Sequence, residues 1–367
     1  MSKRRQKLTD QMLLKALAEL GGSGKAPELA KMLKFPVRTI RYRIQRLKEK
    51  GFFYQQWPQT LDAKLGLGEL GLFLELTEEY RHLPREFLYC FKNFNVHYAT
   101  YGRYNGYFTA GGFPLERPEI IDTMLQDMRK MNILKDHHRF DTVDFIPIQA
   151  DLSRYNPTTG WKWNWKDWVT QSEKAIKSGA PSGFNFSWDR KTMEYDHTDI
   201  AILAEIKEHG HISSKEISKR VGISDTQVRV RMKRLRDENV LRGSVWILPP
   251  SPTSLILYTF VEIDPTNDSA MSCFRYLPFR RDIYMDKPNR FAIRITMNSS
   301  DLVGYMKAFE TLRTYFDSYF FQTVVNRTVA LGGMHSHYQL HNESTNRWEI
   351  PMDDYLQEFE KFVKNHS

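Results

Sequence analysis

The sequence of 367 residues contains only two cysteines, Cys90 and Cys273. Two cysteines so far apart make neither a disulfide framework nor a clustered zinc site, and we expect both thiols to be buried. The sequence also lacks an apolar run of about 18 residues, the length that a membrane-spanning helix needs. The polar opening from Met1 to Lys7 lacks the apolar core of a signal peptide. We therefore expect a cytoplasmic protein with no membrane partner.

Signatures of enzymes are also scarce. The sequence has no phosphate-binding glycine loop, no nucleophile elbow and no zinc-ligand spacing. The pairs His137-His138 and His335-x-His337 lack further ligands and are interpreted as surface histidines. A hydrophobic content of 41% with 26% charged residues is typical of a folded protein and excludes bulk disorder. We expect no catalytic residue, no metal and no cofactor.

What the sequence does contain is positive charge in two short segments. Residues 1–50 hold 14 Lys and Arg against 4 Asp and Glu, a net charge of +10. Residues 190–242 hold 12 against 9, a net charge of +3. Since the whole chain carries +9, the remainder is acidic, with a net charge of −4. Basic charge confined to two segments is the electrostatic pattern expected of a nucleic-acid-binding protein.

The chain contains two copies of a repeat unit that is about half its length. The segment from Ile40 to Leu47 reappears at Val228 to Leu235, at an offset of 188. Shorter matches follow with small shifts in offset, such as Cys90-Phe91 with Cys273-Phe274. Trp161 has a counterpart in Trp348. We infer an internal duplication.

Each copy begins with a pattern of three helices. In the first copy these are expected at residues 9–20, at 26–33 and from Pro36 onward, and the third helix of the second copy starts at Ser224. Each third helix has apolar residues at i, i+4 and i+7, which predicts one buried face and one cationic face. The β-prone runs 52–57 and 240–246 then predict the wing of a winged helix-turn-helix.

The rest of each copy predicts the order strand, helix, strand, strand, helix, strand, which is typical of a ferredoxin-like βαββαβ domain. In the first copy the first helix is expected at 84–94 and the last strand at 139–148; in the second copy this helix is expected at 269–276. The fold class is α+β, with two winged helix-turn-helix domains that each precede a ferredoxin-like domain. The expected segments are a helical domain at 1–60, a sheet domain at 61–150, a Trp-rich arm at 151–194, a second helical domain at 195–250, a second sheet domain at 251–333 and a C-terminal arm and helix at 334–367.

Each copy resembles the Lrp/AsnC (feast/famine) family of transcription regulators. The strongest match runs from Asp196 through the turn at Gly222-Ile223-Ser224 to Leu235, and the first copy departs from the pattern at Leu33-Lys34-Phe35-Pro36. The resemblance covers about residues 7–150 and 195–333. It implies a winged helix-turn-helix joined to a ferredoxin-like ligand-binding and assembly domain. Because family members usually have one unit and dimerise, the fusion of two units implies a covalent pseudo-dimer.

In a helix-turn-helix, the first turns of the third helix enter the major groove of double-stranded DNA. The side chains expected to turn outward are Arg38, Arg41, Tyr42 and Gln45 in the first copy and Thr226, Arg229, Val230 and Lys233 in the second. Those expected to lie nearest the bases are Arg38, Arg41, Gln45, Arg229 and Lys233. The side chains expected to contact the DNA backbone are Arg43, Arg46, Arg231 and Arg234. The alternative is that both cationic faces are merely solvated.

The hairpin of the first copy resembles the glycine-containing hairpin near which effectors of the family bind. Its residues are Gly102, Arg103, Tyr104, Asn105 and Gly106. The glycines free the backbone and Arg103 could hold a carboxylate, whereas a plain hairpin turn is the alternative. A small-molecule effector and self-association through the sheet domains are both left open.

The segment from Trp161 to Trp168 alternates tryptophan with polar residues, and Trp188 follows. We interpret it as an arm that covers a sheet or the neighbouring unit; stacking on bases is the alternative. Val96-His97-Tyr98 with the Tyr-Asn-bearing hairpin also resembles a sheet segment of the sirohaem decarboxylases, which share this architecture. A tetrapyrrole enzyme is therefore the alternative function.

Overall fold

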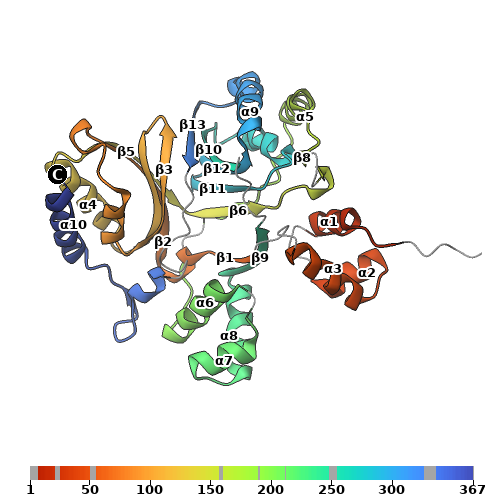
Figure 1. Ribbon diagram of the computed structural model, residues 1–367, viewed down its shortest axis with the longest axis horizontal. Coiled ribbons are helices and arrows are strands. Elements are labelled where there is room, and N and C mark those ends of the chain that lie inside the picture. Colours follow the sequence, from red (N-terminus) through yellow and green to blue (C-terminus); the bar gives the residue numbers. More distant parts are fainter. Residues whose placement is uncertain are drawn as a thin grey trace, which may run out of the picture.

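The computed structural model describes residues 7–20, 25–49, 55–156, 160–188, 191–210, 212–247, 254–325 and 336–366. A central body, in which one nine-stranded sheet is flanked by outer helices, carries two separate three-helix domains (Figure 1). No helix of the described part is both long and apolar enough to cross a membrane.

The first helical domain consists of α1 (Asp10–Glu19), α2 (Ala26–Leu33) and α3 (Val37–Glu49). Helix α2 begins beside Lys25, whose backbone N–H donates to the Glu28 carboxylate at 2.9 Å, and it ends at Lys34, which has a left-handed conformation. The buried faces of the three helices share one apolar core. The three predicted helices are confirmed.

The second helical domain consists of α6 (His197–His209), α7 (Ser214–Val221) and α8 (Asp225–Asp237). Asp196, Ser213 and Ser224 each cap one of these helices through a capping box. Such caps satisfy backbone N–H groups that a helix leaves without an internal partner. These helices therefore begin where local sequence signals place them.

The wing prediction needs correction. Strand β1 (Gln55–Thr60) follows the first helical domain and pairs antiparallel with β9 (Leu241–Ile247), which follows the second. The two strands make a two-stranded sheet with each other instead of contributing to separate wings. Residues 50–54, which hold part of the first predicted wing, lie outside the described residues.

Two four-stranded units with the same strand order form the body. The first sheet unit contains β2 (Leu67–Leu76), β3 (Phe94–Gly102), β4 (Gly106–Pro114) and β5 (Leu134–Thr142), in the order β5-β2-β4-β3. The second contains β10 (Ser254–Glu262), β11 (Arg281–Lys287), β12 (Arg290–Asn298) and β13 (Ser318–Val325), in the order β13-β10-β12-β11. Both orders are those of a ferredoxin-like sheet.

The two sheet units are joined by reciprocal strand pairs. Strand β3 of the first unit pairs with β13 of the second, and β11 pairs with β6 (Asp144–Ile148), which directly follows β5. The single predicted strand at 139–148 is therefore wrong: it breaks at Val143, whose N–H donates to the Met285 carbonyl. Between the inner faces lies an aromatic core that includes Phe73, Phe108 and Phe260. The inner sheet faces are thus occupied within one chain.

Helices cover the outer face of each unit. They are α4 (Glu119–Lys130) on the first unit and α9 (Ser299–Leu312) on the second. The other two expected helices are wrong in type, because residues 85–90 and 268–276 form 3₁₀-helices. Cys90 and Cys273 lie in these 3₁₀-helices and are buried, as predicted.

The arm after each unit covers the helical layer of the other unit. Helix α5 (Trp165–Lys177) packs beside α9, and α10 (Met352–His366) packs beside α4 (Figure 1). Trp168 is fully buried and its indole N–H donates to the Cys273 carbonyl at 2.8 Å. The interpretation of the Trp-rich segment as a covering arm is confirmed, and base stacking by Trp168 is excluded.

Short hairpins in the arms contact the helical domains. The first arm carries β7 (Tyr155–Asn156) and β8 (Gly160–Trp161), and the second carries β14 (His341–Asn342) and β15 (Arg347–Trp348). Trp161 packs against the core of the first helical domain, and Trp348 lies in the core of the second. Each arm therefore connects a helical domain to the body.

Candidate nucleic-acid interface

Helix α3 presents a basic face to solvent. Ile40 and Leu47 are buried on the opposite face. The predicted contact residues that lie on the exposed face are Arg38, Arg41, Tyr42, Gln45 and Arg46. Because all five side chains are exposed, they can contact a polyanion such as DNA.

Arg43 does not belong to that face. It is only partly exposed, and its guanidinium donates to the Asp10 carboxylate at 3.2 Å. Asp10 opens α1, so this ion pair holds α3 against the first helix of its own domain. We therefore revise the predicted backbone contact of Arg43 to an internal packing contact.

Helix α8 presents a less cationic face. Thr226, Arg229 and Lys233 are exposed, as expected for outward-facing residues. Arg229 pairs with Asp225 at 2.8 Å, and Lys233 pairs with Asp237 at 2.5 Å, both along the helix. Exposed pairs of this kind are weak, so DNA phosphates can compete for both cations.

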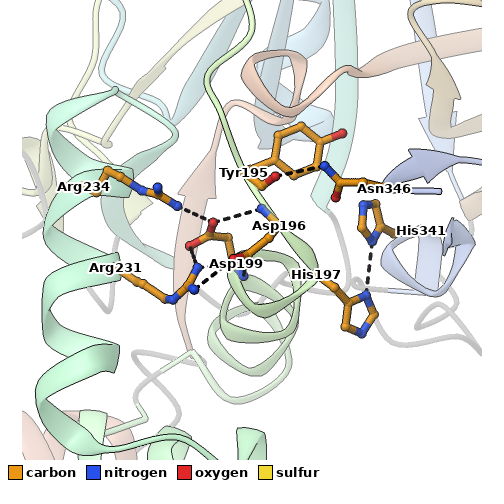
Figure 2. A network of polar contacts seen from close by, with 8 residues as sticks. All are labelled: Tyr195, Asp196, His197, Asp199, Arg231, Arg234, His341 and Asn346. Atoms are coloured by element: carbon orange, nitrogen blue, oxygen red, sulfur yellow. Dashed lines mark hydrogen bonds and ion pairs between the residues drawn. The ribbon is translucent and has the colours of Figure 1, made fainter. Parts of the chain in front are cut away.

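Arg231 and Arg234 instead fasten α8 to the start of α6 (Figure 2). Arg231 donates to both oxygens of Asp196, at 2.8 and 2.9 Å, and lies 3.0 Å from the buried Asp199. Arg234 pairs with the other Asp199 oxygen. Partial burial acts to raise the pKa of Asp196, but the Arg231 guanidinium and the backbone N–H groups of Asp199 and Thr198 together outweigh it and hold that pKa below its ordinary range. The predicted role of these two arginines as backbone contacts is revised to positioning α8.

The same view shows how the second arm is attached. The Nδ1 atoms of His197 at the start of α6 and His341 in β14 lie 3.1 Å apart (Figure 2). The Asn346 side chain donates to the Tyr195 carbonyl at 3.0 Å. The hairpin of the second arm therefore holds the helix that carries the partners of Arg231 and Arg234.

A buried polar cluster beneath the second helical domain was not predicted. Lys207 of α6 donates to Asp62 at 2.7 Å, and both side chains are buried. Tyr338 donates to the other Asp62 oxygen at 2.8 Å, and His337 Nε2 lies 3.2 Å from Asp62. Burial acts to raise the pKa of Asp62, yet Lys207 and His337 together hold it well below its ordinary range. His337 is thus not the expected surface histidine.

No local sequence signal identifies this cluster, because its members come from separate segments of the chain. Asp62 follows β1, Lys207 lies in α6, and His337 and Tyr338 lie in the second arm. Only the docking of the second helical domain on the first sheet unit brings them together. Sequence spacing alone could not have found them.

The predicted effector hairpin is closed by packing. The Tyr104 N–H donates to Gln322 of β13 at 3.1 Å, and Gln322 donates back to the Tyr104 carbonyl. A Cβ atom at Gly102 would lie 2.8 Å from the Phe321 carbonyl oxygen, and one at Gly106 would lie 2.3 Å from the Leu74 oxygen. The glycines thus permit close backbone approach, and the Asn105 side chain bonds to the backbone of Gly102 across the turn.

Arg103 in this hairpin is exposed, and its guanidinium carbon lies 5.1 Å from the centre of the Phe320 ring. The described contacts therefore favour a structural turn over the predicted effector site at residues 102–106.

A cavity of about 640 Å³ lies instead at the counterpart hairpin of the second copy. Trp188, which is 46% exposed, contributes to its wall. Its charged lining residues are Arg139, Lys287 and Arg290 opposite Asp122, Asp141 and Asp286. Arg139 already donates to both Asp122 and Asp141 at 2.8 Å. Equal numbers of acidic and basic groups suit a small zwitterion better than a polyanion.

The histidine of the proposed tetrapyrrole segment is buried. His97 Nδ1 lies 3.0 Å from the Thr109 hydroxyl, and its ring packs on Tyr89. Burial, followed by the nearby Arg85 charge, lowers the pKa of His97 to about 4, which keeps the imidazole neutral near pH 7. Within the described residues, no group of three or more His, Cys, Asp or Glu side chains could hold a metal ion.

Comparison with known proteins agrees with the helical geometry. Residues 195–242 match the family model described as winged helix-turn-helix DNA-binding. The proline dehydrogenase transcriptional activator of Rhizobium radiobacter is 36% identical over 86 residues, which cover 23% of this chain and 55% of the relative. The leucine-responsive regulatory protein of Escherichia coli is 38% identical over 74 residues, covering 20% of this chain and 45% of the relative. The chain spans about half the length of the curated relatives it matches.

Solved structures give broader but weaker matches. The sirohaem decarboxylase NirDL aligns with 96% of this chain and 99% of its own, at 11% identity and a TM-score of 0.47. AsnC of Escherichia coli aligns with 39% of this chain and 99% of its own, at 15% identity and a TM-score of 0.29. Together with the helical geometry, the sequence matches support a winged helix-turn-helix DNA-binding domain at residues 195–242, similar to part of these two regulators.

Proposed function

We propose that the protein is a sequence-specific, DNA-binding transcription regulator in which one chain supplies both DNA-binding domains. The observation that carries the proposal is the exposed cationic face on both third helices, α3 and α8, within two three-helix domains of the same order. Because the second domain also matches winged helix-turn-helix proteins, solvation alone is a poor account of that surface.

The pairing of β1 with β9 supports a pseudo-dimer. At the offset of 188 that relates the two copies, Trp57 of the first copy corresponds to Val245 of the second, and these two residues are Cα partners. Antiparallel pairing of a residue with its own counterpart is the signature of a local two-fold axis. The axis relates the strands that follow α3 and α8, so we propose that the two half-sites are inverted on the DNA.

Effector binding is the second part of the proposal. The cavity beside Trp188 has balanced charge, and its size of about 640 Å³ suits a small organic zwitterion. Its walls come from both sheet units, since Arg139 lies in β5 and Arg290 in β12. A ligand there would contact both halves of the body at once, which is a geometry suited to altering how the two DNA-binding domains are held.

We call α3 and α8 the recognition helices. The DNA-binding proposal is tested by removing one exposed arginine from each of them. We expect Arg41→Ala with Arg229→Ala to weaken binding to selected DNA by about tenfold or more. In the unchanged protein, contact with about eight phosphates predicts a log–log salt slope of roughly −7, and the double variant should change that slope little, because both arginines are expected to face bases and not phosphates. Fluorescence anisotropy over a salt series measures both quantities.

The matched control removes two exposed cations far from both recognition helices, with Arg81→Ala and Lys307→Ala. This variant has the same net charge as the test variant. Equal affinity of test and control variants would reject the two helices as the DNA-contacting surface. A visible-absorption titration with sirohaem tests the enzyme alternative: stoichiometric binding with turnover, and no selected DNA, would replace the regulator by a tetrapyrrole enzyme.

A further inference from the structure

The outward stripe of each recognition helix contains an apolar side chain at the same position. Val230 of α8 is 63% exposed, and Tyr42 of α3, which precedes it by 188 residues, is 59% exposed. One turn earlier on the same stripe stand Thr226 in α8 and Arg38 in α3. The two helices thus expose different chemistry from equivalent positions.

The charges around Val230 leave a neutral centre on the face of α8. Arg229 is paired with Asp225, and Lys233 with Asp237, so both cations are drawn along the helix. Thr226 and Val230 lie four residues apart and therefore project from one side. Two methyl-bearing side chains at the middle of a polar face form an apolar spot that water must cover in the free protein.

Thymine offers the one apolar group that a base edge presents in the major groove, its 5-methyl. Arginine, in contrast, pairs bidentately with the O6 and N7 atoms of guanine. We propose that Val230, supported by Thr226, recognises a thymine methyl, and that the half-site under α8 is thymine-dependent while the half-site under α3 is guanine-dependent through Arg38. This inference rests on the proposed DNA-binding function and adds the base that each domain selects.

The test begins with DNA selected from a random pool by the full-length protein. Each thymine of the selected duplex is then replaced in turn by deoxyuridine, which keeps base pairing and removes only the methyl group. We expect one or two positions in a single half-site to lose about fourfold in affinity, the value of one buried methyl-sized group.

Val230→Ala, combined with the deoxyuridine substitution, completes a double-mutant cycle between protein and DNA. We expect this variant to bind the thymine duplex about fourfold more weakly and to show no further loss on the deoxyuridine duplex. The control is Val303→Ala, because Val303 is 59% exposed on α9, away from both recognition helices. It should retain the full sensitivity to deoxyuridine.

Two outcomes would overturn the inference without touching the proposed function. One is DNA that is selected and bound with no position sensitive to deoxyuridine; the other is undiminished sensitivity in Val230→Ala. Failure of the unchanged protein to select any DNA would instead refute the proposed function itself. Because Val230 is largely exposed, its truncation leaves the cores of both helical domains intact.

Discussion

The two helical domains share three helices in the same order but are attached to the body by different chemistry. The first rests on an apolar contact, in which Ala150 and Leu152, where the first sheet unit passes into the first arm, complete its core. The second rests on Leu65 and Leu67 of the first sheet unit and on the buried charges of Asp62 and Lys207. A duplicated fold can thus keep its helices while its docking surfaces diverge.

Breaking the buried ion pair of Asp62 and Lys207 should give the largest difference in stability between the two helical domains. Lys207→Ala leaves the Asp62 carboxylate buried without its cation, which costs about 3–5 kcal/mol. Chemical unfolding should show that loss, and hydrogen exchange should place it in α6–α8 rather than in α1–α3. Asp62→Asn with Lys207→Met removes both charges and should recover part of the loss; the same loss in the double variant would contradict an electrostatic origin.

The cluster also predicts acid sensitivity confined to the second domain. The pKa of Asp62 is held below its ordinary value of 3.8 in the fold, so the unfolded chain takes up this proton first as the pH falls. The stabilisation from Asp62 is therefore complete above that value and declines below it. Protection of α6–α8 that does not fall between pH 5 and pH 3 would contradict this assignment.

The ion pairs inside each helical domain should give a smaller difference in stability between the two domains. Arg231→Ala with Arg234→Ala strips the buried Asp199 of both cations, at a cost of about 1–3 kcal/mol. Arg43→Ala breaks a pair whose partners are 27% and 34% exposed, and should cost less than about 1 kcal/mol. Thermal unfolding measures both, with Arg236→Ala, an exposed residue of α8, as the control. Equal losses in the two domains would remove the distinction.

The smallest effect is expected at the histidine pair of the second arm. The short Nδ1–Nδ1 contact needs one neutral ring, and burial, together with the His197 charge, lowers the pKa of His341 below its ordinary 6.5. The nearby carboxylates of Asp196 and Glu343 act in the opposite direction. Stability from this pair is thus present above about pH 6.5 and is lost as the pH falls through the folded-state pKa.

Hydrogen exchange of β14 and β15 should accelerate between pH 7 and pH 5, relative to β7 and β8 of the first arm, which lack such a pair. His341→Gln should abolish that pH dependence. If the two hairpins respond alike, the histidine pair is not the cause.

The helices of both domains were predictable because their signals are local. Ser224 caps α8, and apolar residues at Val228, Met232 and Leu235 set its buried face. A short stretch of sequence is therefore enough to predict this helix. The 3₁₀-helices were mistaken for α-helices, since both kinds bury the same apolar residues. The exposed basic residues were predictable for the same local reason.

Features that depend on distant partners were not predictable. Strand β1 pairs with β9, and α5 and α10 each pack on the sheet unit of the other copy. No local pattern relates these segments to their partners. Arg43, Arg231 and Arg234 carry the same charge as their exposed neighbours, and only the positions of Asp10, Asp196 and Asp199 reveal their different role. Charge alone did not separate contact residues from positioning residues.

The placement of α10 has a consequence for the order in which the chain is synthesised. The first sheet unit is translated by Thr142, yet the apolar surface beside α4 is covered by Tyr355 and Phe359 of α10. During translation this surface stays exposed on the ribosome while the entire second half is made. A unit translated in the first half of the chain is therefore among the last to finish folding, and a nascent chain halted before α10 would present that surface to chaperones.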